Sequence, residues 1–292
     1  MDWSELFARY AADPSAAWGA DQPLQARKLR ERLAEKAGAG ARDATGIVAD
    51  IVANARLRSA PPALFLVNCG SSGSHWIEAM LARTNGIHAC GEVYVAPSLH
   101  EPLAALDAHA RACFMDALHQ LHAEDPRRPI HAGDMLINSA HSWKPHDLAG
   151  DSARAVLLVR DPLDVVLSRT FRKPRLRRHV ALDASDEQYL ARNRDYVVRF
   201  MASALRRRPG HVIRYEDARE DPARVLAEVM VAAGRPFDAA MAAVPADAGA
   251  GDRAGARGNL YRGPDAELPD GLVDRLAAEL APLRERMGYL PH

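Results

Sequence analysis

The sequence predicts an α/β protein with three layers, in which a central parallel sheet is flanked by helices. Four short apolar runs, at 63–68, 134–140, 155–159 and 211–215, alternate with longer helical patterns. Such runs are typical of parallel strands that are buried on both faces. A Gly/Ser-rich turn at 69–74 follows the first run and leads into a helix, which is the arrangement of a phosphate-binding βα unit.

The composition is that of an ordinary globular protein. The chain has 292 residues, of which 38 are Lys or Arg, 38 are Asp or Glu, and 48% are hydrophobic. These values exclude low-complexity disorder for the chain as a whole. Because there is no basic excess, no sequence-independent binding of nucleic acid is expected. Lysine is scarce, so arginine supplies nearly all of the positive charge.

Cysteine usage and the N-terminus bear on the compartment. Cys69, Cys90 and Cys113 are an odd number without metal-type spacing. They predict neither a disulfide framework nor a zinc site, and a reducing compartment fits them. The N-terminus lacks the pattern of a signal peptide, and no apolar run is long enough to span a bilayer. We therefore expect a cytoplasmic protein with no transmembrane segment.

Residues 1–60 are predicted to form a helical N-terminal extension. A charged amphipathic helix is expected at 25–37, and a second helix at 43–58 has Asp43 or Thr45 as its N-cap. The consecutive prolines at 61–62 then force extended chain before the first strand.

Helical patterns follow the predicted strands along the rest of the chain. No internal repeat and no linker between two cores is evident, so a single domain is predicted over 1–292. It comprises the extension, a core at 61–264 and a C-terminal segment at 265–292. The expected helices are 75–83, 103–122, 161–171, 187–207, 221–234 and 268–287, with a Gly/Ala-rich loop at 244–264.

The turn after the first strand has the composition of an anion-binding loop. Its glycines allow backbone N–H groups to converge on an anion, its serines add donors, and the following helix adds its dipole. It is not a Walker A loop, because it lacks the required lysine. Alone it is equally typical of a structural turn. The residues concerned are Gly70, Ser71, Ser72, Gly73, Ser74, His75 and Trp76.

A second motif follows the third predicted strand. That strand delivers Arg160 at its carboxyl end, the place where ligands bind in open α/β sheets. Ser168 lies eight residues later, about two turns along the next helix. An arginine and a hydroxyl so placed could grip one phosphate. The alternative is that Arg160 only pairs with Asp161 or Asp164.

Two further motifs occur near the C-terminus. The sequence Arg-Tyr-Glu-Asp at 214–217 stands at the end of the fourth predicted strand, and it could equally be a turn followed by a helix cap. An Arg/Gly-rich stretch at 253–258 lies in the late loop, and alone it would read as a solvated segment.

Together and in this order, the four motifs resemble those of the sulfotransferases that use 3′-phosphoadenosine 5′-phosphosulfate (PAPS), and a bacterial member is expected. The resemblance covers about 63–258 and implies the P-loop-like sulfotransferase fold. It implies that the loop binds the 5′-phosphosulfate, that Arg160 and Ser168 bind the 3′-phosphate, and that Tyr215 and Trp76 contact the adenine. The late loop of the family, RKGxxG, is matched by Arg253, Gly255 and Gly258, with Ala254 in place of the lysine. Ala254 and Arg257 are expected to contact the donor together with these three residues.

The chain departs from the family pattern at the loop cation. Ser71 stands where the family has a lysine or arginine that stabilises charge on the leaving phosphate. Losing one such cation costs a few kcal/mol of transition-state stabilisation unless it is replaced. Candidate replacements are His75, Lys144 and Arg257. The departure also leaves open a divergent or non-catalytic nucleotide-binding homologue.

Two residues compete for the role of base. Cys90-Gly91-Glu92 resembles the stretch in tyrosylprotein sulfotransferases whose glutamate is the base, so Glu92 falls on that position. His141 ends the second predicted strand as the basic histidine of cytosolic sulfotransferases does, and an ordinary pKa near 6.5 suits the role. Glu92 is slightly favoured, with His141 orienting the acceptor.

The implied reaction is in-line transfer of a sulfuryl group from PAPS to a hydroxyl (or amine) of an acceptor, with release of 3′-phosphoadenosine 5′-phosphate (PAP) and no metal. The basic segment at 171–178 suggests an anionic acceptor, or simply a solvated loop. A homodimer is compatible with the sequence. The alternative enzyme class is a P-loop kinase-like phosphotransferase, although the lysine and a magnesium-binding aspartate are not evident.

Overall fold

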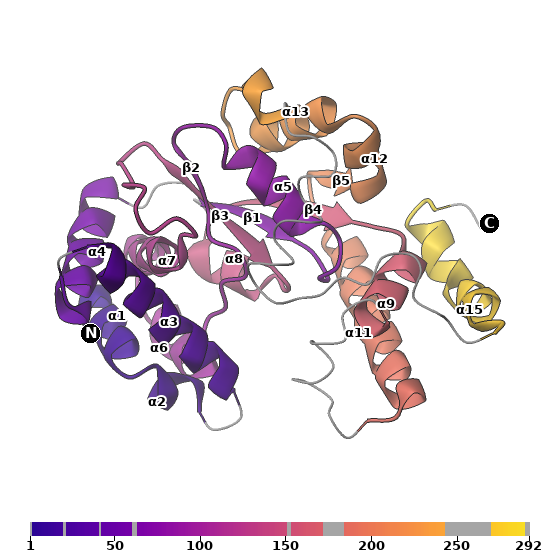
Figure 1. Ribbon diagram of the computed structural model, residues 1–292, viewed down its shortest axis with the longest axis horizontal. Helices are drawn as coiled ribbons and strands as arrows, with labels where there is room; N and C mark the ends of the chain where they lie inside the picture. Colours follow the sequence, from indigo (N-terminus) through magenta and orange to yellow (C-terminus); the bar gives the residue numbers. More distant parts are fainter. Residues whose placement is uncertain are drawn as a thin grey trace.

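The predicted fold class is confirmed by a computed structural model, which describes residues 2–19, 22–40, 42–59, 63–150, 153–171, 184–242 and 270–289. Five parallel strands form one sheet in the order β2-β3-β1-β4-β5, with helices on both faces (Figure 1). The strands are β1 (Ala63–Val67), β2 (Ile87–Ala89), β3 (Met135–Ala140), β4 (Arg154–Val159) and β5 (Val212–Arg214).

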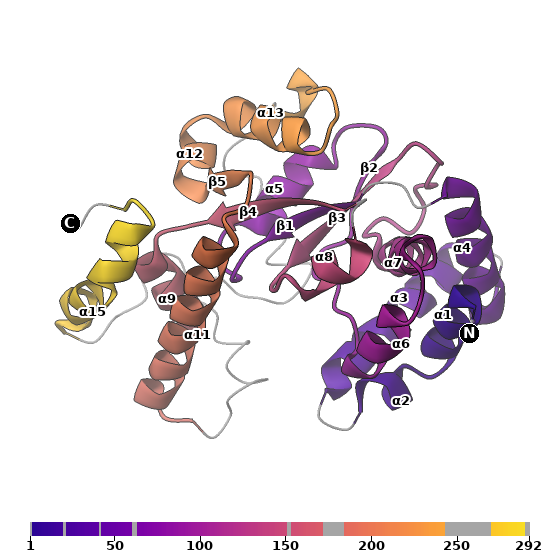
Figure 2. The same cartoon turned by 180° about the vertical axis from the view of Figure 1, so that it is seen from behind.

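Alternate residues of the central strands enter two separate apolar cores. In β1, Leu64 and Leu66 face one core, whereas Phe65 and Val67 face the other. This alternation is required by the two-residue period of a strand that is buried on both faces. One face is covered by α5 (Ser74–Leu81), α12 (Tyr215–Glu220), α13 (Pro222–Ala232) and η3 (Ala239–Ala242). The other is covered by α7 (Ala108–His122), α8 (Lys144–Ala149), α9 (Pro162–Thr170) and α11 (Asp186–Arg207), as Figure 2 also shows.

The N-terminal helices pack into the apolar core that lies on the α7, α8, α9 and α11 face of the sheet. Phe7 and Phe114 meet edge to face, with ring centroids 5.7 Å apart, and both are fully buried. At the other end of the chain, α15 (Leu272–Arg286) lies against α9, and Arg284 binds Asp161 at 2.8 Å. The N-terminal helices are α1 (Trp3–Ala12), α2 (Pro14–Trp18), α3 (Pro23–Ala39) and α4 (Ala44–Arg58).

Most predicted elements are confirmed, but the helix over 103–122 is wrong. The structure divides that region into η1 (Pro97–Leu99), α6 (His100–Ala104) and α7. The division falls at Asp107, whose carboxylate accepts a hydrogen bond from the amide of Ala110 and caps α7. Asp43 caps α4 in the same way through the amide of Gly46, as predicted. The sequence did not indicate β2, which has only three residues.

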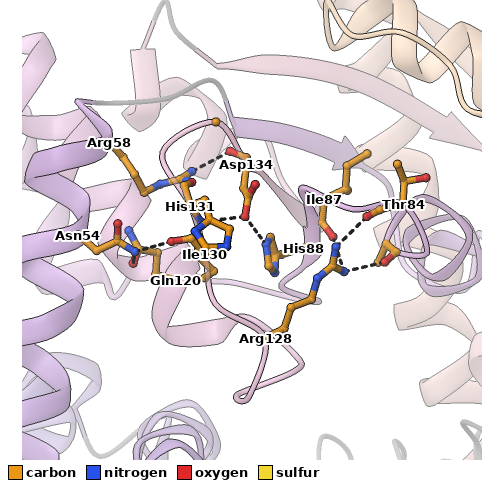
Figure 3. Close-up of polar contacts among 12 residues, drawn as sticks. Asn54, Arg58, Thr84, Ile87, His88, Gln120, Arg128, Ile130, His131 and Asp134 are labelled. Atoms are coloured by element: carbon orange, nitrogen blue, oxygen red, sulfur yellow. Dashed lines mark hydrogen bonds and ion pairs between the residues drawn. The ribbon is translucent and has the colours of Figure 1, made fainter.

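A buried polar network occupies the amino edge of the sheet (Figure 3). The Arg58 side chain is fully buried; its Nε lies 3.0 Å from the Asp116 carboxylate, and its Nη2 donates to the carbonyl of Asp134. The Asp134 carboxylate in turn pairs with Nε2 of His88 at 2.8 Å. Arg128 donates to three carbonyls of the turn that leads into β2. These contacts tie α4 to the starts of β2 and β3.

The helices of the described ranges include none that is both long enough and apolar enough to cross a membrane.

Two buried histidines on α7 make the stability of the fold depend on pH. Burial, together with the charge of Arg58, lowers the pKa of His119 to about 3. Burial likewise lowers the pKa of His122 to about 3, and Arg32 adds to the effect. In the unfolded chain both groups titrate near 6.5. Their contribution to the free energy of unfolding is therefore complete above pH 6.5 and is lost as the pH falls toward 3.

We predict that the free energy of unfolding falls between pH 7 and pH 5 by about 2 kcal/mol for each of these histidines. Urea denaturation at the two pH values measures the difference. His119→Gln should remove about 2 kcal/mol of that difference, because glutamine does not titrate. His109→Gln, at an exposed position of the same helix, is the control and should leave the difference unchanged. An unaltered pH dependence in His119→Gln would contradict the prediction.

Candidate active site

The predicted site residues gather at the carboxyl edge of the sheet, around the end of β1. This strand lies between β3 and β4. After β1 the chain forms β2 and β3, which both lie on one flank of β1 within the sheet. It then crosses to the opposite flank, where it forms β4. Such a reversal opens a crevice at the carboxyl ends of the strands. The loop at 68–73 lies in this crevice.

Asn68 anchors the beginning of the loop. Its amide donates to the carbonyl of Ala140 at 2.9 Å, and its Nδ2 donates to Ser139 Oγ at 3.1 Å. Its Oδ1 accepts a hydrogen bond from the amide of Gly70 at 2.8 Å. Ser139 Oγ then donates to Ser74 Oγ at 2.7 Å, so the end of the loop is fixed as well. Because these side chains are buried, the contacts hold the loop against the end of β3.

The backbone of the loop has the geometry of an anion cradle. Gly70, Ser71 and Gly73 all have left-handed φ values, of 73°, 58° and 86°. Gly73 is the N-cap of α5 and provides no side-chain cap, so the positive end of the helix dipole faces the loop. A Cβ atom at Gly73 would overlap the ring of Tyr215, which is a second reason for glycine there.

Two buried polar atoms beside the cradle lack a hydrogen-bond partner among the described residues. They are Ser71 Oγ and Trp76 Nε1. Both belong to the loop or to the first turn of α5. Since a buried donor without a partner costs about 1–3 kcal/mol, a polar ligand at this loop would relieve that cost.

Arg160 extends from the end of β4 over the loop. Its Nη1 donates to the carbonyl of Ser71 at 3.3 Å, and its guanidinium lies 4.6 Å from the centre of the Tyr215 ring. It also pairs with Asp164 at 2.9 Å, as the alternative interpretation expected. Asp161 instead binds Arg284 of α15. The structure therefore brings together the first three sequence motifs.

The two predicted adenine contacts lie beside each other. The rings of Trp76 and Tyr215 meet edge to face at 6.1 Å. Trp76 is only 8% exposed and belongs to the apolar core on the α5, α12 and α13 face of the sheet. It therefore packs as a core residue beside the cradle. Ser168 is buried on α9. The Tyr215 motif has a further structural role, because Glu216 accepts a hydrogen bond from Tyr289 beyond α15.

The structure unites the two rival bases in one cluster with His75. Glu92 follows β2 and His141 follows β3, and these strands are neighbours. Glu92 Oε1 lies 3.4 Å from His141 Nε2 and 3.5 Å from His75 Nε2. Tyr94, which the sequence did not indicate, donates to Glu92 Oε2 at 3.2 Å and lies 3.0 Å from His141 Nδ1. Glu92 is therefore the centre of the cluster.

The charges of this cluster reinforce one another. Burial opposes the charged form of His75, but hydrogen bonds to Glu78 and Glu92 outweigh it and raise the pKa of His75 to about 9. Burial also opposes the charge of Glu92, yet the positive charge of His141 and the hydrogen bond from His75 hold its pKa well below the usual value. At neutral pH the cluster thus pairs an ionised Glu92 with a cationic His75.

His75 also belongs to a small group of side chains whose atoms could coordinate a metal ion. One ligand atom each of His75, Glu78 and Glu124 can be chosen so that all lie within 4.8 Å of one another, a spacing that a cation could use. Glu78 is fully buried, and burial raises its pKa. Its contact with His75 Nδ1, at 3.3 Å, accounts for its position without an ion.

Arg169 is a further basic residue at the loop that sequence reasoning missed. Its Nη1 donates to the carbonyl of Cys69 at 2.8 Å. The only signal was its place directly after Ser168 in the helix that follows the third predicted strand. Of the cations that the sequence suggested, Lys144 is exposed, and burial together with its charge lowers the pKa of His100. Arg253, Ala254, Gly255, Arg257 and Gly258 lie outside the described residues, as does the basic stretch at 172–178.

Comparison with known proteins gives only distant structural likenesses. No protein-family model and no curated protein matches the chain. Similar solved structures include the sulfotransferase domain of the Synechococcus PCC 7002 olefin synthase, with 20% identity, 76% of this chain and 95% of that chain covered, and a TM-score of 0.43. The sulfotransferase domain of the curacin biosynthetic pathway has 17% identity, coverages of 76% and 98%, and a TM-score of 0.43. A sulfotransferase from Alicyclobacillus acidocaldarius has 14% identity, coverages of 77% and 93%, and a TM-score of 0.45. These likenesses are too distant to assign an activity to this chain.

The raised pKa of His75 is directly measurable. We predict that its ring resonances titrate near pH 9 in NMR spectra of the folded protein. Glu78→Gln should move this titration to lower pH, because it removes the contact that raises the pKa of His75 most. Glu101→Gln, an exposed change on α6, is the control. A titration of His75 at or below pH 6.5 in the unsubstituted protein would show that the pairing with Glu78 and Glu92 is absent.

Proposed function

We propose that this chain transfers a sulfuryl group from PAPS to a hydroxyl, or amine, of an acceptor and releases PAP. One observation carries the proposal. The loop with the geometry of an anion-binding cradle lies between Arg160 and Tyr215 on one side and the cluster of Glu92 and His141 on the other. The loop and Arg160 are suited to a nucleotide with two anionic ends, and the cluster is suited to removing a proton from an acceptor.

The residues present fit such a donor. In this assignment the loop at 70–75 and the start of α5 bind the 5′-phosphosulfate, and the unpartnered Ser71 Oγ supports a polar ligand there. Arg160 and Ser168 bind the 3′-phosphate, and Tyr215 with Trp76 borders the adenine. The late-loop residues Arg253, Ala254, Gly255, Arg257 and Gly258 are assigned to the donor through the sequence resemblance alone.

The proposed mechanism assigns one step to each side of the loop. PAPS supplies an activated sulfuryl group with PAP as its leaving group. Glu92 removes the acceptor proton, while Tyr94 and His141 hold the two oxygens of its carboxylate in place. His75, cationic at neutral pH, adds positive charge beside the loop, where negative charge develops on the leaving phosphate. Positioning and electrostatics then account for catalysis.

Binding of nucleotides tests the donor assignment. We predict that isothermal titration detects PAP binding that does not change when Mg²⁺ is added, because the assigned contacts are all protein groups. ATP and GTP should bind more weakly, since neither carries a 3′-phosphate for Arg160. A preference for ATP with Mg²⁺ would contradict the proposal and support a kinase-like phosphotransferase.

Substitutions in the cluster test the assignment of the base. We predict that Glu92→Gln lowers sulfate transfer from labelled PAPS to a metabolite pool by at least about 100-fold, because general-base catalysis contributes about 10²–10⁴-fold. PAP binding should be unchanged. His141→Ala should lower the rate less, since Glu92 is still present to accept the proton. A near-normal rate in Glu92→Gln, with a large loss in His141→Ala, would reverse the two roles. PAP binding without transfer to any acceptor would instead indicate a non-catalytic homologue.

A further inference from the structure

The guanidinium of Arg169 is held against the loop by three contacts. Nη1 donates to the carbonyl of Cys69 at 2.8 Å, and Nε donates to Asn193 Oδ1 at 3.2 Å. The ring of Tyr196 lies 4.5 Å from the guanidinium carbon and supports it from one face. Because helix α11 supplies both Asn193 and Tyr196, the side chain of Arg169 is fixed before any ligand binds.

Its position is the junction between the loop and the base cluster. A Cβ atom built on Gly70 would lie 2.6 Å from Arg169 Nη1 and 3.2 Å from His141 Cε1. Arg169 and His141 therefore approach the same loop residue. Tyr196 also donates to the carbonyl of His141 at 3.3 Å. In the proposed reaction, the transferring group passes through the space between the loop and this cluster.

The charge of Arg169 is not matched by a carboxylate within the described ranges. No Asp or Glu of those ranges forms an ion pair with it, and its guanidinium instead contacts a carbonyl, an amide oxygen and an aromatic ring. The other cations near the loop differ in this respect. Arg160 is paired with Asp164, and His75 is paired with Glu78 and Glu92. Arg169 thus retains its charge for an anionic ligand.

We propose that Arg169 binds the 5′-phosphate of the donor and supplies the positive charge that Ser71 cannot supply. This inference rests on the proposed function. During transfer the bond between sulfur and the bridging oxygen breaks, and its electron pair passes to the 5′-phosphate. A new bond forms between sulfur and the acceptor oxygen, whose proton goes to Glu92. Arg169 stabilises the charge that collects on the leaving phosphate.

Three nucleotides separate the contribution of each phosphate. Calorimetry with PAP, adenosine 3′-monophosphate and adenosine 5′-monophosphate needs no acceptor and no turnover. We expect Arg169→Met to weaken PAP and the 5′-monophosphate by about 10- to 100-fold, the range for hydrogen bonds to a charged group. Binding of the 3′-monophosphate should stay within about twofold of the wild-type value. Arg169→Lys should bind PAP more weakly than the wild type and more tightly than Arg169→Met. Lysine keeps the positive charge but lacks the forked donors of the guanidinium.

Two control variants complete the design. Arg160→Met should show the reciprocal pattern, with weaker binding of PAP and the 3′-monophosphate and unchanged binding of the 5′-monophosphate. Arg224→Met, on the exposed side of α13, should alter none of the three. Circular dichroism and thermal melts report whether each variant is folded.

The outcomes distinguish this inference from the proposed function. Equal weakening of all three nucleotides by Arg169→Met would overturn the inference alone, because it would show that Arg169 only supports the loop through Cys69. Unchanged PAP binding in Arg169→Met would overturn it as well. Failure of the wild-type protein to bind PAP would overturn the proposed function, and the inference with it.

Discussion

The candidate site depends on the buried hydrogen bonds of Asn68. This side chain links the loop to β3 through Ser139, and Ser139 reaches Ser74 at the start of α5. In a buried setting such bonds are costly to break, since each released group would remain unsatisfied. The loop is therefore presented to a ligand in one conformation. The proximity of Arg160, Arg169 and His141 to the loop follows from that fixed conformation.

Positive charge at the loop is distributed over several elements. The family that the sequence resembles has a lysine on the loop, whereas this chain has Ser71. Around that position the structure brings His75 from α5, Arg160 from the end of β4 and Arg169 from α9. Each comes from a rigid helix or strand end, so little side-chain entropy is lost when an anion binds. This arrangement fits a chain in which arginine supplies most of the positive charge.

The two edges of the sheet have different roles. At the amino edge, the fully buried Arg58 meets Asp116 and ties the N-terminal helices to the strand starts. Removing one member of such a pair is costly, since the other charge remains buried. At the carboxyl edge, Glu92 and His141 stay partly exposed, at 27% and 17% of their side chains. Rigid polar contacts at one edge thus accompany an accessible site at the other.

The sequence by itself determined the fold class, four of the strands, the loop and the placement of Arg160 at a strand end. These follow from local patterns, namely apolar runs, turn residues and helix caps. Only the tertiary structure decided that Glu92 and His141 share one cluster, that Tyr94 joins them and that Arg169 reaches the loop. Neighbouring parallel strands are distant in sequence, so their order and register set which side chains meet. Local patterns carry no information on either.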